Sequence, residues 1–158
     1  MSVYVRLRVA SEAYAIPVEH VVLVARFGQV TVVPGSRPEM LGVLSLRGQI
    51  LPVVDLALLL GISSPAPPAS LVVAEAGGRQ ACLAIDEVSE IGELPDPTEE
   101  TESGMLAGAA LIGGELIGFI DVASIFAALD APAVSGAAWP PAHGADRPVA
   151  GSPGGIRP

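Results

Sequence analysis

Few residues of this sequence carry side chains that could do covalent chemistry. Before residue 131 the sequence contains one histidine, His20, and one cysteine, Cys82. Ser45 lies three residues after Gly42, so this pair does not have the Gly-x-Ser-x-Gly spacing of a nucleophilic serine. Nucleophilic catalysis also needs a base and an orienting group in contact with the nucleophile. The sequence gives no sign of catalytic residues, and we expect no enzyme.

Three aspartates could bind a metal ion if the fold brought them together. Each one ends an apolar run, and the three are Asp55, Asp86 and Asp121. Capping explains them more simply, because an aspartate before a helical turn accepts hydrogen bonds from the first free N–H groups. The pairs Gly77-Gly78 and Gly113-Gly114 come with neither a P-loop lysine nor a dinucleotide motif. We therefore expect no metal site and no cofactor.

Charge is distributed unevenly along the chain, whose formal net charge is −9. Residues 1–61 contain five arginines and four acidic residues, whereas residues 62–130 contain one arginine and twelve acidic residues. Nucleic-acid binding needs clustered lysine and arginine, so we expect no nucleic-acid partner. The acidic stretch over 86–102 is either a solvated loop that aids solubility, which we favour, or a surface for a basic partner.

The stretch from Gly42 to Gly61 must be central to the fold. Residues 43–47 alternate between two faces, which predicts a strand, and residues 50–54 form a second apolar run. Because Arg47-Gly48-Gln49 separates the two runs, we expect a tight hairpin with Arg47 at its tip. Asp55 and Gly61 are then expected to cap one or two helical turns over 56–60.

Further strand-like runs follow one another along the chain. They cover 3–9, 13–16, 21–25, 30–33, 71–76, 79–85, 88–94, 106–112 and 115–120, and a short helix over 122–129 follows Asp121. Arg6 and Arg8 are expected to point outward, and Cys82 is expected to be a small core residue. Closely spaced strands joined by tight turns predict an all-β barrel or sandwich.

No stretch of the sequence is long and apolar enough for a spanning helix, which needs about 20 apolar residues. The best window, 105–129, is interrupted by Glu115, Asp121 and Gly113-Gly114. The N-terminus also lacks the long apolar run of a signal peptide. We expect a soluble cytoplasmic protein with no direct membrane insertion.

The pattern of apolar residues ends near Ala131. The last 28 residues contain six prolines and five glycines. Such a composition cannot bury enough apolar surface to become ordered, so we predict a folded domain over 1–130 and a disordered tail over 131–158. Trp139 in that tail is either an incidental residue, which we favour, or an anchor for a partner.

The stretch Leu46-Arg47-Gly48-Gln49-Ile50-Leu51-Pro52-Val53-Val54-Asp55-Leu56 resembles the CheW-like family, the coupling proteins of bacterial chemosensory systems. Further segments match the family in order along the chain. They are 14–18, 30–34, 42–43, 84–88 and 118–122. The resemblance spans residues 3–129 and is specific because several motifs occur in sequence.

This resemblance implies two packed five-stranded Src-homology-3-like β-barrels with a short C-terminal helix. It also implies a non-catalytic adaptor that couples the cytoplasmic helices of chemoreceptors to the regulatory domain of a CheA-type histidine kinase, at the inner face of the membrane. By motif, the receptor-facing groove between the barrels would include Val21, Leu23, Val24, Gly42, Arg47 and Gly48. The alternative for Arg47 is a structural role, with its guanidinium bonded to carbonyls at the barrel junction.

Three positions depart from the family pattern. Leu23 and Ala57 stand where the family usually has charged residues, and Ser45 stands where it has asparagine. Fewer charges make an interface more apolar and can change its partner. Three alternatives therefore stay open: an accessory scaffold with a different protein partner, a small-molecule sensor or enzyme that uses the cleft between the barrels, and a self-assembling structural protein.

Overall fold

The computed structural model describes residues 1–130, and the predicted disordered tail over 131–158, with Trp139, lies outside the described residues. In chain order the strands are β1 (Ser2–Val9), β2 (Glu12–Pro17), β3 (Val21–Arg26), β4 (Met40–Leu46), β5 (Gln49–Asp55), β6 (Ser70–Ala76), β7 (Arg79–Ile85), β8 (Glu87–Leu94), β9 (Leu106–Ile112) and β10 (Glu115–Ile120). A 3₁₀ turn, η1 (Val18–His20), follows β2, and the two helices are α1 (Leu56–Leu60) and α2 (Val122–Asp130).

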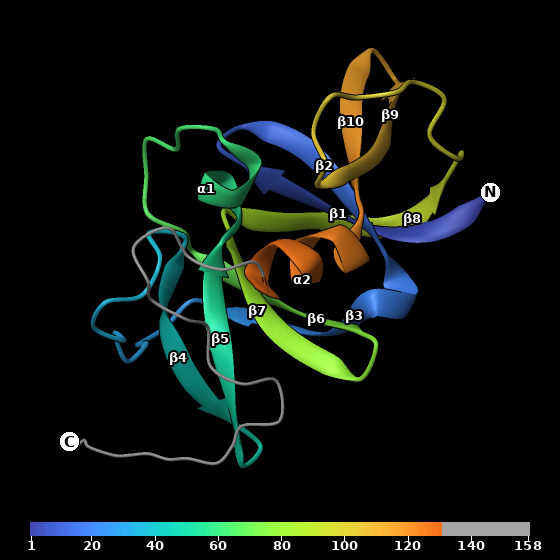
Figure 1. The fold of residues 1–158 in the computed structure, drawn as a ribbon. Helices are drawn as coiled ribbons and strands as arrows, with labels where there is room; N and C mark the ends of the chain where they lie inside the picture. The colour runs from blue at the N-terminus through green and yellow to red at the C-terminus, as the bar shows by residue number, and fades with distance from the viewer. Residues whose placement is uncertain (131–158) are drawn as a thin grey trace.

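The strands form two five-stranded sheets (Figure 1). The first sheet has the order β8-β1-β2-β10-β9, and the second has the order β3-β6-β7-β5-β4. Each sheet contains one parallel pair, β2 with β10 and β5 with β7, and its other pairs are antiparallel. The predicted all-β fold of two packed five-stranded barrels is therefore confirmed. We call them the first and the second barrel.

Residues on β7 show how the apolar pattern builds more than one core. Ala81, Leu83 and Ile85 belong to the cluster shared by the two sheets, whereas Cys82 and Ala84 belong to the interior of the second barrel. This period of two lets one strand serve two cores, since successive side chains point to opposite faces. A third cluster, with Tyr4 packed edge-on against Phe119, fills the first barrel.

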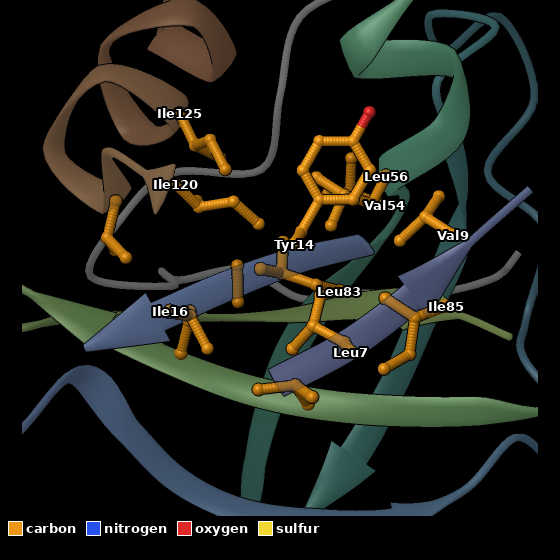
Figure 2. Packing of buried hydrophobic residues seen from close by; sticks show 14 of the residues in the cluster. Leu7, Val9, Tyr14, Ile16, Val54, Leu56, Leu83, Ile85, Ile120 and Ile125 are labelled. Atoms are coloured by element: carbon orange, nitrogen blue, oxygen red, sulfur yellow. The ribbon is translucent and has the colours of Figure 1, made fainter. Parts of the chain in front are cut away.

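The cluster between the sheets is the largest of the three. Figure 2 shows Leu7, Tyr14 and Ile16 of the first barrel in one group with Leu83 and Ile85 of the second. The two helices close this cluster. Val122, Ile125, Phe126 and Leu129 form the buried face of α2, as the sequence predicts. The apolar contact that results holds the barrels together.

Two of the three aspartates cap helices as predicted. Asp55 Oδ1 accepts hydrogen bonds from the N–H groups of Ala57 at 3.0 Å and Leu58 at 3.4 Å. Asp121 Oδ1 accepts one from the N–H of Ser124 at 3.2 Å. These bonds satisfy donors that the first helical turn leaves free.

The capping prediction is wrong for Asp86. Its carboxylate accepts a hydrogen bond from the N–H of Ala10 at 2.9 Å and so braces the β1–β2 turn. A strand, β8, follows Asp86 in place of a helix. Within residues 1–130, no three His, Cys, Asp or Glu side chains lie close enough together to hold a metal ion.

The predicted strand over 30–33 does not form. Thr31 alone pairs with β4, through two 2.8 Å hydrogen bonds with Val43. The chain then turns, and Ser36 donates both its N–H and its hydroxyl to the carbonyl of Val33. Val32 is 70% exposed, so the apolar run was no sign of a buried strand here.

The arginines of β1 point away from the cluster between the sheets, but not freely into solvent. Arg6 pairs with Glu90 at 2.9 Å, and Arg8 pairs with Glu115 at 2.6 Å. Both arginine side chains are partly buried. They close one end of the first barrel. Among the described residues, no helix is long and apolar enough to cross a membrane.

Candidate partner-binding groove

The second barrel has an open side. β3 and β4 are the two edges of its sheet, and a groove of about 710 Å³ lies between them. Its floor is the barrel core, with Leu71, Val73 and Cys82. The lining residues are Leu23, Ala25, Arg26, Gly28, Gln29, Val30, Thr31, Val43, Leu44, Ser45, Leu46, Leu71, Val73 and Cys82.

This location differs from the expected one. The resemblance implied a groove between the barrels, where buried apolar side chains and the two helices fill the contact between the sheets. That expectation stays a prediction. All the lining residues belong to the second barrel and to the chain that links β3 to β4. The groove described here opens at the edges of the second sheet.

The three candidates on β3 have different surroundings. Leu23 lines the groove. Val21 is half-buried and packs against the cluster between the sheets. Val24 is 43% exposed and does not line the groove. Of the three, Leu23 alone is therefore placed to contact a ligand bound in the groove.

Gly42 lies next to the groove and allows two segments of its wall to approach each other closely. It is buried, its φ is +155°, and a Cβ at this position would lie 2.3 Å from the carbonyl oxygen of Thr31. Only glycine leaves room for the pairing of Thr31 with Val43, both of which line the groove. Gly42 therefore shapes the site without offering a side chain.

Arg47 and Gly48 form the two-residue turn between β4 and β5. Their φ angles are +52° and +80°, as in the turns that match the twist of a hairpin. A positive φ is uncommon for arginine, and the backbone here is strained. The turn lies next to Leu46, at the rim of the groove.

The Arg47 side chain is exposed and makes no hydrogen bond or ion pair with any described residue. The structural alternative for Arg47, with the guanidinium bonded to carbonyls at the barrel junction, is therefore wrong within residues 1–130. A strained residue that makes no internal contact is typical of a site selected for its surface chemistry.

The groove is apolar and carries positive charge. Arg26 is its one charged lining residue, and it has no hydrogen-bond or ion-pair partner among the described residues. Burial raises the pKa of Cys82 to about 11, so this thiol stays protonated at neutral pH and is a poor nucleophile. His20 Nδ1 lies 2.9 Å from the carbonyl oxygen of Glu75 and serves to hold η1 against β6.

Sequence reasoning missed part of the wall. Arg26 and the segment 28–31 line the groove, but Arg26 was not singled out, and residues 30–31 were noted only in a predicted strand and a family motif. Alternation on β3 offered one signal, because Leu23 and Ala25 share the face that lines the groove. The contribution of Val30 and Thr31 could not be foreseen, since it depends on a long-range pairing with β4.

The CheW-like domain model matches residues 3–130. This chain belongs to the CheW-like family. It is 28% identical to "Probable chemotaxis protein CheW" of Rhizobium etli over 139 residues, which cover 82% of this chain and 90% of the relative. It is 26% identical to "Chemotaxis protein CheW" of Rhizobium meliloti over 132 residues, which cover 77% of this chain and 85% of that protein.

A solved structure agrees with the sequence matches. The "scaffolding protein TtCheW" of Thermoanaerobacter tengcongensis superposes with a TM-score of 0.69 and 25% sequence identity, over 76% of this chain and 88% of that one. The chain is thus a chemotaxis scaffold of the CheW family, as its sequence motifs predict.

Proposed function

We propose that this protein is a non-catalytic adaptor that couples the cytoplasmic helices of chemoreceptors to the regulatory domain of a CheA-type histidine kinase. One observation carries the proposal: an apolar groove opens beside Arg47, an exposed guanidinium that the described residues leave without a partner. Its family membership supports the same role. Such an adaptor works in the cytoplasm, at the inner face of the membrane, through its receptors.

In this proposal the groove of the second barrel takes the receptor. Apolar side chains of a receptor helix cover Leu23 and Leu44, and Arg47 contacts the helix from the rim. Gly42 and Gly48 fix the backbone that presents these side chains. The other two candidates contribute indirectly: Val21 holds β3 against the core, and Val24 offers apolar surface on its outer face.

The kinase needs a second surface, and the first barrel offers one. Leu111 and Leu116 lie directly opposite each other on the β9–β10 hairpin and are 68% and 60% exposed. The two adjacent leucines give this hairpin an exposed apolar surface that a partner protein can cover. We assign the contact with the kinase regulatory domain to this hairpin.

Affinity purification from cells tests both assignments. A tagged wild-type chain is expected to recover a receptor and a histidine kinase together. Arg47→Glu is expected to lose the receptor and keep the kinase, and Leu116→Glu is expected to do the reverse. Val22→Glu, which adds a negative charge on β3 outside the groove, is the control and should recover both. Normal recovery of the receptor by a folded Arg47→Glu variant would contradict the proposal.

The groove also supports one alternative. Its volume of about 710 Å³ falls in the range of small-molecule sites, roughly 300 to 1,000 Å³. A sensor function predicts a large rise in melting temperature with one metabolite and none with a receptor fragment. The adaptor function predicts the opposite pattern.

A further inference from the structure

The two barrels are built on one plan. β1–β2 and β6–β7 are the central hairpins, β8 and β3 pair with the first strand of each, and β9–β10 and β4–β5 pair with the second (Figure 1). A short helix follows each of the latter hairpins, and its N-cap is Asp121 in the first barrel and Asp55 in the second. Positions in the two barrels can therefore be compared one by one.

The correspondence extends to unusual backbone. Gly42 and Gly108 both have φ of +155°, and each lies under a carbonyl oxygen of the preceding loop. A Cβ would be 2.3 Å from the oxygen of Thr31 at Gly42, and 2.8 Å from that of Glu99 at Gly108. In each barrel this loop residue forms an isolated bridge with the residue after the glycine. Individual residues of the first barrel can thus be aligned with individual residues of the second.

At one position, the two facing residues of the first barrel differ in chemistry from the two facing residues of the second. Arg6 and Val73 each precede the turn of their central hairpin by four residues. Glu90 lies opposite Arg6, and Leu23 lies opposite Val73. Leu23 is therefore the counterpart of Glu90. An ion pair in the first barrel is replaced by an apolar pair in the second.

The ion pairs close the first barrel. Arg6 binds Glu90 at 2.9 Å and approaches Glu115 to 3.8 Å, and Arg8 binds Glu115 at 2.6 Å. These four side chains connect β1 to its neighbour β8 and to β10, which lies beyond β2 in the sheet.

The second barrel has no such closure. The counterparts of Arg8 and Glu115 are Glu75 and Gln49, and neither makes an ion pair among the described residues. Leu23 and Val73 instead line the groove. The groove exists where the second barrel lacks the ion pairs of the first.

The second barrel also carries positive charge at this opening that the first barrel lacks. Arg26, at the end of β3, is the counterpart of Glu93 on β8. Arg47, at the groove rim, is the counterpart of Gly113. No acidic residue lines the groove to neutralise Arg26 or Arg47. The groove of the second barrel and its rim are therefore apolar, with two guanidinium groups that no described acidic residue pairs.

We infer that the groove of the second barrel binds an apolar helix that carries acidic side chains, whose carboxylates pair with Arg26 and Arg47. This inference rests on the proposed function and specifies the chemistry of the receptor segment. Guanidinium groups bind carboxylates through paired hydrogen bonds, and the pairing strengthens when a ligand excludes water. Complementary charge also rejects wrong partners, since a basic helix would place like charges together.

Two synthetic peptides test the charge preference directly. Both carry the same leucine stripe at helical spacing, flanked by glutamates in one peptide and by lysines in the other. Calorimetry with the full chain is expected to give a Kd for the glutamate peptide at least about tenfold lower, or 1.4 kcal/mol. Added salt should reduce the difference. Equal binding, tighter binding of the lysine peptide, or binding of neither overturns the inference.

A matched pair of variants locates the binding to the groove. Leu23→Glu restores the acid found in the first barrel, and its carboxylate competes with the peptide for the arginines. Val22→Glu places the same charge on the preceding residue, which is 38% exposed and lies outside the groove. We expect Leu23→Glu to raise the Kd of the glutamate peptide about tenfold and Val22→Glu to leave this Kd unchanged. Equal effects of the two variants overturn the inference.

A second pair keeps the test valid if Leu23→Glu fails to fold. Arg26→Gln/Arg47→Gln is expected to abolish the preference for the glutamate peptide. Val22→Glu/Ala107→Glu changes the net charge by the same amount outside the groove, and the preference should survive.

A second copy of this chain is the competing occupant, through its acidic strand β8. A rise of molar mass with concentration that Glu93→Arg prevents would assign the groove to self-association and overturn the inference.

The peptide experiments need neither receptor nor kinase. If the glutamate peptide binds as expected but the tagged chain recovers no receptor, the proposed function fails and the charge preference stands. If the receptor is recovered but both peptides bind equally, the inference alone fails.

Discussion

Leu23 occupies in the second barrel the position that Glu90 occupies in the first. Each lies on an outer strand, opposite Val73 in one case and Arg6 in the other. The acidic residue joins an ion pair that closes its barrel, and the leucine lines an open groove. The difference between these equivalent positions thus coincides with the opening of the groove in the second barrel.

The ion pair of Glu90 is predicted to contribute little to stability. Its carboxylate is 60% exposed, and pairs of this kind contribute about 1 kcal/mol or less. Glu90→Leu should therefore lower the free energy of unfolding by at most about 1 kcal/mol, as measured by urea denaturation. A loss near that of a buried ion pair, about 3 kcal/mol or more, would contradict this.

Gly42→Ala should be severely destabilising. The added Cβ would lie 2.3 Å from the carbonyl oxygen of Thr31, and the bond between Thr31 and Val43 would have to break. We expect a loss of about 2 kcal/mol or more. Gly104→Ala is the control, because nothing lies within 4 Å of its Cβ and its φ is not positive. Equal unfolding midpoints for the two variants would exclude the close approach.

Arg47→Gly should stabilise the chain while it impairs receptor binding. Glycine adopts the φ of +52° without strain, which should raise the free energy of unfolding by about 1 kcal/mol. Ser11, with φ of +71° in the β1–β2 turn, provides the matched control. Ser11→Gly should stabilise similarly and recover the receptor normally. Loss of the receptor with both variants would show that added stability, and not the guanidinium, explains the defect.

Alkaline pH should destabilise the chain partly through Cys82. Burial raises the pKa of this thiol from 9.0 to about 11. Because the folded chain holds the proton more tightly, this contribution is complete below pH 9 and is lost as the pH approaches 11. Urea denaturation between these values should show a steeper loss for the wild type than for Cys82→Ala. Burial also raises the pKa values of Tyr4 and Tyr14, but both proteins share these groups. Parallel curves would contradict the assignment to Cys82.

Local signals in the sequence were sufficient for most of the fold. Glycine pairs between apolar runs placed two hairpins, and an aspartate before a short apolar run placed both helices. These features depend on a few neighbouring residues, so the sequence carries them directly. The strand expected over 30–33 was wrong because its pairing depends on β4, and only Thr31 reaches it.

The site was harder to predict than the fold. Motifs placed Leu23 and Arg47 near one another, but the groove depends on which two strands remain at the edges of the second sheet. The counterpart of Leu23 is Glu90, 67 residues along the chain, and no local pattern connects them. Their equivalence appears only when the strand registers are known.

Photo-crosslinking in cells is the most direct test of the central claim that the groove of the second barrel binds the receptor. A photoreactive residue is placed at Ser45, which lines the groove, or at Leu111, which is its counterpart on the first barrel. We predict an adduct with the receptor from position 45 and with the kinase from position 111. A receptor adduct from position 111, or none from position 45, would contradict the account.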